Sequence, residues 1–329
     1  MKKILQHLFQ HQSLSHAQAR EILVNISENK YNEAQIAAFV TVYLMRSITV
    51  EELSGFREAL LDLCVPIDLS DYATIDMCGT GGDGKNTFNI STLSSFVLAG
   101  AGYKVAKHGN YGVSSACGSS NVLEHFGYQF TNNQDTLRRQ LDQSNICFLH
   151  APLFHPALKS VGPIRRQLGV KTFFNMLGPL VNPSQPEQQL VGVFSQELAR
   201  LYQYIYQKTN KQYAIIHALD GYDEVSLTGN VKVKTPHNEQ VITPSDFGKN
   251  RLAPEQIFGG DTIEAAASIF INVLEGNGTL AQNDAVAVNT ALGIRCYKPN
   301  ATLLECVVEA EESLQSGKAL TSFKTLLSS

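Results

Sequence analysis

A glycine-rich segment at residues 78–84, which reads C-G-T-G-G-D-G, has residue types and spacing suited to binding chemistry. It follows residues 73–78, which predict a short buried strand, and the sequence N-I-S-T at residues 89–92 then predicts a helix start. Glycines lack the Cβ atoms that would keep a backbone from wrapping an anion, and a helix N-terminus offers unpaired N–H donors. These features together predict a phosphate cradle.

The same glycines have a competing interpretation, because Gly79, Gly81 and Gly84 match the G-x-G-x-x-G pattern of dinucleotide-binding loops. Several polar residues separate Gly84 from the helix, and the next predicted strand ends at Lys107 rather than at an acidic residue. A sharp turn that needs glycine only for its geometry is the structural alternative. Asp83 and the polar N-I-S-T side chains favour ligand binding over that turn.

A second polar cluster follows the strand predicted at residues 103–106. It begins with K-H-G-N at residues 107–110 and continues, before a helix expected to start near Asn121, with Ser114, Ser115, Gly118, Ser119 and Ser120. Parallel sheets bind ligands beyond the carboxyl ends of their strands, so we expect this cluster to form a second wall of the phosphate site. By itself, a serine-rich loop is more often a solvated turn.

Two adjacent carboxylates, Asp223 and Glu224, end the sequence D-G-Y-D-E at residues 220–224, just after a strand predicted at residues 213–217. Mg²⁺ prefers oxygen ligands and commonly bridges one or two carboxylates to substrate phosphates. An acidic solvated turn is the usual structure of such a segment. Its predicted place at the edge of the sheet that carries both anion loops favours a metal site.

Two neighbouring arginines, Arg165 and Arg166, lie in a segment predicted to be helical. Consecutive helical residues point about 100° apart, so at most one of the two side chains faces a given cleft. A guanidinium can donate two parallel hydrogen bonds to a carboxylate, which makes one of them a candidate carboxylate anchor. Phe173, Phe174 and Met176 could pack a ring of the ligand or belong to the core.

The elements that must position these clusters divide the chain in two. Residues 1–70 predict a small all-helical domain, since capping-box pairs precede helically spaced apolar residues at Ser15 with Gln18, Asn32 with Gln35, and Thr49 with Glu52. Residues 71–329 predict a large α/β domain with a mostly parallel sheet flanked by helices. The alternation rests on strand-like runs at residues 73–78, 103–106, 146–149, 190–194 and 213–217, and on helical runs at 93–101, 196–207 and 263–273.

Two segments interrupt this alternation. Residues 155–168 predict a helix, and N-M-L-G-P-L-V-N-P at residues 175–183 is rich in turn formers. We expect the stretch 153–185 to return to the helical domain. Residues 229–248 predict short polar strands or loops at the periphery.

Composition narrows the class of protein. The 329 residues are 43% hydrophobic, which allows a sizeable core, and 26 Lys plus Arg against 30 Asp plus Glu give a net charge of −4. Without a dense basic run, nucleic-acid binding is not expected. Six cysteines without a C-x-x-C pair predict a reduced, cytoplasmic protein, and no apolar run reaches the roughly 18 to 20 residues of a membrane span.

Taken in order, these segments resemble the anthranilate phosphoribosyltransferase family over nearly the whole chain. The matching segments are C-G-T-G-G-D with N-I-S-T, K-H-G-N, H-P-A with R-R, N-M-L-G-P-L-V-N-P and D-G-Y-D-E. The resemblance implies a Mg²⁺-dependent transfer from phosphoribosyl pyrophosphate (PRPP) to anthranilate with release of pyrophosphate, an early step of tryptophan biosynthesis. It also implies a homodimer formed through the helical domain.

The resemblance assigns roles by matching position, without a strong catalytic acid or base. For PRPP, it implies Gly79, Gly82, Asp83, Thr87, Asn89, Ile90, Ser91, Thr92, Lys107 and Ser119. For anthranilate, it implies Gly79, His108, Asn110, Arg165 and Pro179. For magnesium, it implies Ser91, Asp223 and Glu224.

The sequence departs from the common family pattern in the second cluster. Tyr111 stands where most members have arginine, Ala116 where a basic residue is frequent, and S-N at residues 120–121 replaces the usual A-D. Two other functions remain to be compared: a nucleoside phosphorylase of related fold, and a non-catalytic relative that binds nucleic acid. The K-H-G-N and G-P-L-V-N-P segments favour the transferase, and the acidic turn with no basic surface opposes nucleic-acid binding.

Overall fold

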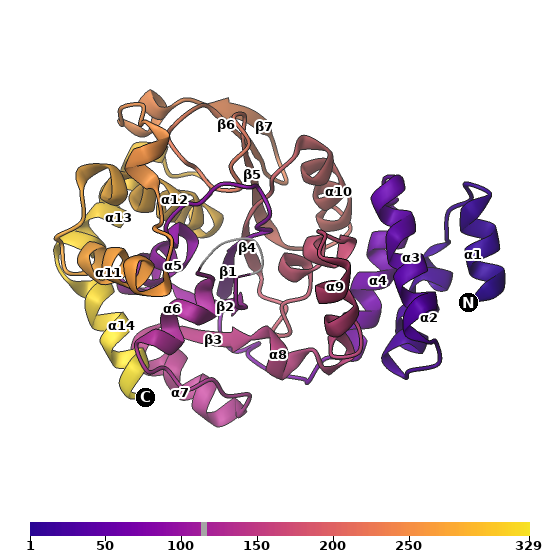
Figure 1. Cartoon of the computed structure of the whole chain (residues 1–329). Helices are drawn as coiled ribbons and strands as arrows, with labels where there is room; N and C mark the ends of the chain where they lie inside the picture. Colours follow the sequence, from indigo (N-terminus) through magenta and orange to yellow (C-terminus); the bar gives the residue numbers. More distant parts are fainter. Residues whose placement is uncertain (113–116) are drawn as a thin grey trace. The chain divides into compact units, whose positions relative to one another are not determined.

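The computed structural model describes residues 1–112 and 117–329, so Ser114, Ser115 and Ala116 of the second cluster lie outside the described residues. The chain divides into two compact units, one helical and one with a central sheet (Figure 1). The helical unit comprises Met1–Pro66 and Ala151–Pro183, and the α/β unit comprises Ile67–His150 and Ser184–Ser329. The sequence predicts the first boundary at residue 70 and the returning segment at residues 153–185.

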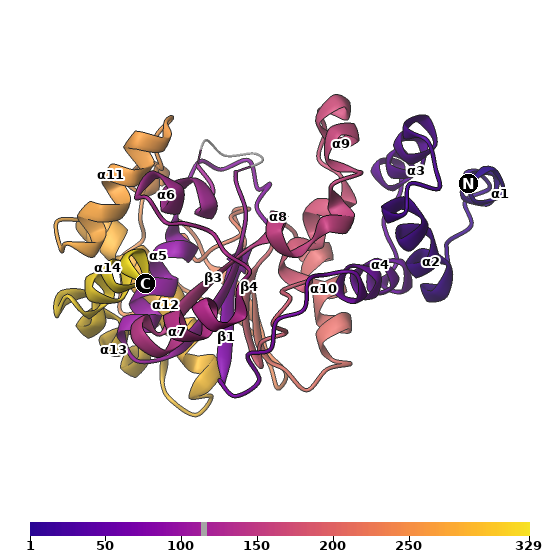
Figure 2. The ribbon, with the colours of Figure 1, turned by 90° about the horizontal axis from the view of Figure 1, so that it is seen from below.

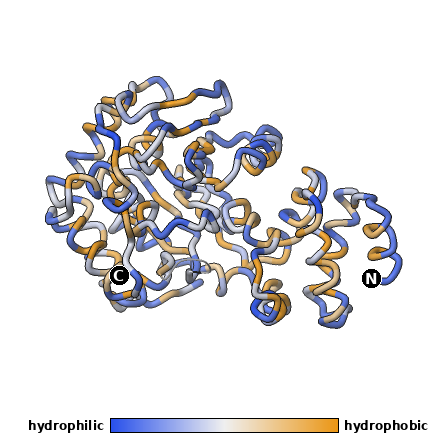
Figure 3. Tube along the Cα trace, turned by 45° about the horizontal axis from the view of Figure 1, so that its top comes forward, coloured by the Kyte–Doolittle hydropathy of each residue, from blue (hydrophilic) through white to orange (hydrophobic). Residues whose placement is uncertain are grey.

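Local signals account for the first helices of the helical unit, which are α1 (Lys2–Phe9), α2 (His16–Ser27), α3 (Glu33–Met45) and α4 (Val50–Asp62). The three predicted capping boxes are present at the starts of α2, α3 and α4, each with both reciprocal hydrogen bonds. Hydrophobic and hydrophilic stretches alternate along the segments next to the N-terminus (Figure 3), as expected for helices that bury one face.

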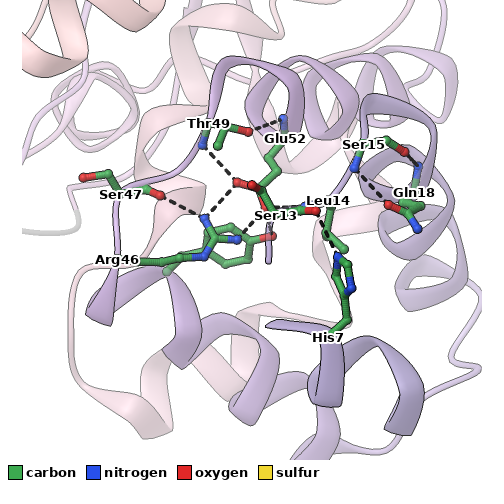
Figure 4. Close-up of polar contacts among 10 residues, drawn as sticks. His7, Ser13, Leu14, Ser15, Gln18, Arg46, Ser47, Thr49 and Glu52 are labelled. Carbon is green, nitrogen blue, oxygen red and sulfur yellow. Dashed lines mark hydrogen bonds and ion pairs between the residues drawn. The ribbon is translucent and has the colours of Figure 1, made fainter. Parts of the chain in front are cut away.

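A buried carboxylate joins α4 to the end of α3 and to the segment before α2 (Figure 4). Glu52, at the start of α4, accepts hydrogen bonds from the backbone N–H groups of Leu14 and Thr49, both at 2.9 Å. It also pairs with Arg46 after α3 and accepts a hydrogen bond from Tyr43 Oη at 3.2 Å. Hydrogen bonds and the guanidinium lower the pKa of Glu52 against the opposing effect of burial. Ion pairing and hydrogen bonding compensate this buried charge.

The second segment of the helical unit adds rings to its core. Phe173 stacks on Phe56 of α4 with ring centroids 4.7 Å apart, and on Phe174 at 4.3 Å. Its ring also contacts Phe39 and Tyr43 of α3. The sequence left open whether these rings pack a ligand or belong to the core. Phe173 and Phe174 are both buried, so they belong to the core of the helical unit.

One predicted helix of this segment is wrong as a continuous element. Residues 155–168 form the short 3₁₀ helix η1 (Pro156–Leu158) and then α9 (Gly162–Leu168), after α8 (Ala151–Phe154). Pro156 and Pro163 each lie at the first turn of the helical piece in which they occur, because proline has no N–H to donate further inside. Two 3₁₀ helices, η2 (Phe173–Met176) and η3 (Gly178–Leu180), follow.

The α/β unit is built on a sheet whose order, within the described residues, is β3-β2-β1-β4-β5-β6-β7. The strands are β1 (Thr74–Gly79), β2 (Lys104–Gly109), β3 (Ile146–His150), β4 (Gln188–Gly192), β5 (Gln212–Ala218), β6 (Val231–Lys234) and β7 (Glu239–Ile242). The strands β1 to β5 pair in parallel, and β6 and β7 add an antiparallel edge. The predicted mostly parallel sheet is confirmed, and the segment 229–248 forms that edge.

Helices cover both faces of this sheet, most of them on one side (Figure 2). That side carries α5 (Ile90–Gly100), α11 (Ile263–Leu274), α12 (Leu280–Tyr297), α13 (Leu303–Gln315) and α14 (Lys318–Ser328), while α10 (Gln196–Tyr206) packs on the other side against β5. Helices α6 (Ser119–His125) and α7 (Gln134–Ser144) follow β2. Helices α5 and α12 are buried on most sides.

Within the described part of the chain, no helix has both the length and the apolar character that crossing a membrane requires.

Candidate functional site

The strand order places the candidate loops at a reversal of the chain's winding. From β1 the chain adds β2 and β3 on one side of the sheet, and it then returns to add β4 and β5 on the other. Ligands of open α/β sheets bind beyond the carboxyl ends of the strands at such a reversal. The glycine loop leaves β1 at this point, and the acidic segment leaves the nearby β5.

Close packing of backbone explains two of the glycines. A Cβ atom on Gly79 would lie 2.3 Å from Asp223 Oδ2, and one on Gly192, which pairs with Gly79 at the end of β4, would lie 1.4 Å from the Asp223 carbonyl oxygen. The acidic segment therefore lies directly against the ends of β1 and β4, and no other residue type fits there without displacing it.

The glycine loop itself grips the first carboxylate. Gly81, Gly82 and Gly84 all have positive φ, in the region that favours glycine. This conformation lets the Gly81 N–H donate to Asp223 Oδ2 at 2.7 Å. Asp83 accepts a hydrogen bond from the Lys85 N–H at 2.9 Å and lies close enough to Asp223 to raise its pKa. The structure thus brings the first and third clusters of the sequence together.

The second carboxylate caps the helix predicted from N-I-S-T. Helix α5 begins at Ile90 after the N-cap Asn89, as predicted. Glu224 Oε1 accepts a hydrogen bond from the Ser91 N–H at 3.0 Å, and the Thr87 hydroxyl donates to Glu224 Oε2 at 3.4 Å. A helix N-terminus carries a partial positive charge, which stabilises an anion. The Glu224 carboxylate lies at this N-terminus, where the sequence predicts that a phosphate binds.

Burial makes this carboxylate pair unusual. Asp223 and Glu224 are 7% and 9% exposed, and no ion pair to either is found among the described residues. Burial, with the charge of Asp83, raises the pKa of Asp223 to about 7. Burial and the charge of Asp223 raise the pKa of Glu224 well above its usual range. Two adjacent buried carboxyl groups that resist ionisation form a site whose charge a divalent cation would compensate.

The donor set fits magnesium of the substrate-bridging kind. Among the described residues, no group of three or more His, Cys, Asp or Glu side chains is arranged to hold a metal by itself. Magnesium often takes only one or two carboxylates from the protein and completes its shell with water and substrate phosphate. Asp223 and Glu224 offer oxygen ligands of that type, and Ser91, whose backbone N–H donates to Glu224, adds a hydroxyl as a further candidate.

The lysine of K-H-G-N lies inside the sheet. Lys107 is 2% exposed, and its Nζ donates a hydrogen bond to the Met77 carbonyl oxygen of β1. Burial lowers the pKa of this amine, while the charges of Asp76 and Glu224 oppose that shift. Its charge therefore acts on the site from beneath the glycine loop. The neighbouring His108 is also buried, and its N–H donates to Asp76 Oδ1 at 3.1 Å.

The described part of the second cluster forms a loop beside the glycine loop. Asn89 Nδ2 donates to the Cys117 carbonyl oxygen at 3.0 Å, which joins the two loops. The Asn110 carbonyl oxygen accepts from the Ser119 hydroxyl at 3.3 Å and from the Ser120 N–H at 3.1 Å. Helix α6 begins at Ser119, two residues before the predicted start. The exposed Asn110 is thereby fixed at the carboxyl end of β2.

The predicted site residues of the helical unit differ in how far their side chains are buried. Arg165 is half-buried, donates to Asn175 Oδ1 at 3.1 Å, and lies 5.5 Å from the centroid of the Phe174 ring. Burial lowers its pKa. Arg166 is exposed, so the two arginines do face different surroundings, as their spacing requires. Pro179 is buried within η3.

Several residues that shape the site gave no signal in the sequence. The segment after η5 (Pro254–Ile257) braces the glycine loop: Asn86 Nδ2 donates to the Gly260 carbonyl oxygen at 2.9 Å, and the Gly259 N–H donates to the Asn86 carbonyl oxygen at 2.7 Å. Asn121 Oδ1 accepts from the N–H groups of Gly112 and Gly118 at 2.9 and 3.0 Å. The contacts of Asn86 depend on distant chain segments meeting, which spacing alone does not indicate.

Fold and site together define a two-domain glycosyl transferase. The glycosyl transferase family a/b domain matches residues 71–320, and the glycosyl transferase family helical bundle domain matches residues 2–64. The chain belongs, within this class, to the anthranilate phosphoribosyltransferase family. It is 57% identical to the anthranilate phosphoribosyltransferase of Christiangramia forsetii and 59% identical to that of Flavobacterium johnsoniae, in each case over 99% of this chain and 98% of the relative.

Solved structures agree with this assignment. The anthranilate phosphoribosyltransferase of Thermus thermophilus is 29% identical, with a TM-score of 0.88 over 98% of both chains. The Saccharomyces cerevisiae enzyme in complex with PRPP and Mg is 28% identical, with a TM-score of 0.89 over 98% of this chain and 96% of that one. The same yeast enzyme in complex with 4-fluoroanthranilate is 27% identical, with a TM-score of 0.88 over 98% and 95%.

Proposed function

We propose that this protein transfers the 5-phosphoribosyl group of PRPP to the amine of anthranilate, with Mg²⁺, giving N-(5-phosphoribosyl)anthranilate and pyrophosphate. This reaction is an early step of L-tryptophan biosynthesis. The observation that carries the proposal is that the buried Asp223 is bonded to the glycine loop after β1 and the buried Glu224 to the start of α5. The relatives that share the fold include a complex with PRPP and Mg, which supports the same substrates here.

We assign the phosphoribosyl site to the two joined loops of the α/β unit. Gly82, which has a positive φ, and Asp83 belong to the glycine loop, and Ser119 starts α6. The side chains of Ile90 and Thr92 are buried, so any contact they make with PRPP would use their backbone. The remaining proposed contacts are Gly79, Thr87, Asn89 and Ser91, with the buried charge of Lys107 beneath them.

For magnesium, we assign Ser91, Asp223 and Glu224. The pair of buried carboxyl groups has raised pKa values because the structure holds them close together in a poorly solvated position. When bound, Mg²⁺ would neutralise the charge that develops on the departing pyrophosphate. The protein's own contribution is to hold the two carboxylates and the Ser91 hydroxyl at one end of α5.

For anthranilate, we assign Arg165, Asn110, His108, Pro179 and Gly79. Arg165 is suited to orienting the substrate carboxylate, because a guanidinium donates paired hydrogen bonds and Asn175 already holds one of its nitrogens. Anthranilate brings a neutral amine near pH 7, so a fixed ring close to the ribose C1 needs no strong general base. We therefore give none of these residues an acid or base role.

A direct assay tests the proposal. Anthranilate fluorescence should fall when purified protein, PRPP and Mg²⁺ are all present, and it should stay constant when any one of them is omitted. If a folded preparation leaves the fluorescence unchanged, the transferase assignment is wrong, and phosphate-dependent cleavage of pyrimidine nucleosides should then be measured to test the phosphorylase alternative.

We also propose a homodimer that forms through the helical unit. Helix α3 is apolar nearly all round, and a helix of that kind is normally buried on most sides. Its last residue, Met45, is nevertheless 85% exposed, and Phe9 at the end of α1 is 61% exposed. Helices α1 and α3 contact each other, so these side chains belong to neighbouring elements that a second copy could cover.

A further inference from the structure

Tyr111, the residue after the K-H-G-N segment, is held in an aromatic cluster at the carboxyl ends of β2 and β3. Its ring meets the His150 ring edge to face, with centroids 5.0 Å apart and an interplanar angle of 83°. The His150 ring is stacked on Phe130 at 4.1 Å, and its Nδ1 lies 2.9 Å from the Ser120 hydroxyl. We define the aromatic cluster as Tyr111, Phe130 and His150.

The hydroxyl group of Tyr111 is not suited to binding an anion. Its hydroxyl donates to Glu124 Oε1 of α6 at 3.1 Å, and the side chain is 37% exposed. A tyrosine hydroxyl has only one hydrogen to donate, so a hydroxyl that donates to a carboxylate has none left for a phosphate. Tyr111 therefore does not replace an arginine by gripping the same ligand.

The backbone of Tyr111 is instead bonded to a proposed substrate contact. The Tyr111 N–H donates to the side-chain oxygen of Asn110 at 2.8 Å. The Asn110 carbonyl oxygen is fixed from the other side by Ser119 and Ser120 at the start of α6. With its Oδ1 facing an N–H group, the Asn110 amide turns its Nδ2 donor to the other side, which is the polarity that a carboxylate ligand needs.

The strand register ties the cluster to this loop. Gly109, the residue before Asn110, pairs with His150 across β2 and β3. A Cβ atom on Gly109 would lie 2.4 Å from Phe148 Cζ and 2.4 Å from the Ser119 hydroxyl oxygen. The loop therefore passes close over the end of the sheet, and the ring of Tyr111 is the side chain that holds its outer edge against His150.

We propose that Tyr111 is a positioning residue for the acceptor substrate. Wedged between His150 and Glu124, it sets the orientation of the Asn110 amide, so that Asn110 presents a donor to the carboxylate of an aromatic acid. This inference rests on the proposed function. In it, the aromatic cluster orders the K-H-G-N loop. Tyr111 acts through Asn110 and does not itself contact the substrate.

The decisive experiment is a double-mutant cycle on the purified full chain. Tyr111→Ala should raise the KM for anthranilate roughly tenfold, while the KM for PRPP and kcat change by less than about twofold. Tyr111→Phe keeps the ring and should stay within about threefold of wild type. In an Asn110→Ala background, Tyr111→Ala should add no further increase, because Asn110 is the group through which it acts.

Controls separate a positioning role from a structural one. Tyr204→Ala removes an exposed tyrosine of α10 and should leave every constant unchanged. If Tyr111→Ala does not fold, Tyr111→Leu is measured against the same expectations. Fully additive effects in the cycle, or an anthranilate KM equal to wild type, would overturn the positioning role while leaving the proposed function standing. Wild-type protein without any turnover would contradict both.

Discussion

At the residue scale, the unusual feature of the site is the pair of buried carboxyl groups of Asp223 and Glu224. A solvated acidic turn would keep ordinary pKa values, but Asp223 is buried against the ends of β1 and β4, and Glu224 is buried at the start of α5. Hydrogen bonds from Gly81 and Ser91 stabilise their ionised forms, yet burial outweighs those bonds and raises both pKa values. The fold therefore maintains a pair of poorly ionised carboxyl groups, which is expected at a functional site rather than in a structural turn.

This arrangement predicts that the contribution of Asp223 to the stability of the metal-free protein falls as the pH rises. The pKa of Asp223 is raised from 3.8 to about 7, so the folded state retains a proton that the unfolded state has lost. The contribution of Asp223 to the free energy of unfolding is therefore fully present below pH 3.8 and is lost as pH rises to about 7. Mg²⁺ should restore stability at the upper end of this range.

Thermal unfolding at several pH values, with and without Mg²⁺, checks this prediction. Asp223→Asn should flatten the metal-free profile, because the amide does not titrate, and Glu224→Gln with Asp223→Asn should remove the stabilisation by Mg²⁺. Asp246→Asn, at an exposed carboxylate whose pKa is lowered by Thr243, is the matched control. Equal stabilisation by Mg²⁺ in the double variant and wild type would argue against the metal assignment.

Arg165 carries a second prediction at the same scale. Arg165→Ala should raise the KM for anthranilate about 10- to 100-fold, since a charged hydrogen bond contributes about 1.5 to 3 kcal/mol, while the KM for PRPP changes little. Steady-state kinetics with each substrate varied in turn provide the measurement. Arg166→Ala removes the exposed neighbour and serves as control. If both variants give the wild-type anthranilate KM, Arg165 does not orient the acceptor.

At the element scale, the close contact between the end of β4 and the acidic segment after β5 fixes the position of Asp223. Gly192→Ala should displace the acidic segment, because its Cβ would overlap the Asp223 carbonyl oxygen at 1.4 Å. We expect a loss of about 1 to 3 kcal/mol in the free energy of unfolding, typical of overpacking, together with weaker Mg²⁺-dependent activity. Denaturant unfolding and turnover assays check both effects. Gly162→Ala, whose Cβ meets nothing within 4 Å, should be neutral, and similar losses in both variants would refute the packing argument.

Elements with local signals were predictable from the sequence. The three capping boxes place α2, α3 and α4 correctly, because each depends on residues only three positions apart. Residues 155–168 were predicted as one helix and are two pieces, because Pro156 and Pro163 each lie in the first turn of a separate helical piece. The grouping of Gly81, Asp223 and Ser91 could be anticipated only through the parallel-sheet rule. The brace from Gly259 and Gly260, and the capping of Glu224 on α5, depend on contacts over long sequence separations.

Association of two copies is the prediction that belongs to the whole molecule. Phe9→Asp combined with Met45→Asp should convert a dimer into monomers, because two carboxylates would have to be desolvated where apolar surface is now exposed. Sedimentation equilibrium or light scattering across a concentration range measures the mass. Leu280→Asp changes a similarly exposed apolar residue, 74% exposed, at the start of α12 in the α/β unit, and should leave the mass unchanged. A monomeric wild-type protein, or a dimer that persists in the Phe9 and Met45 variant, would show that these two side chains do not form the interface.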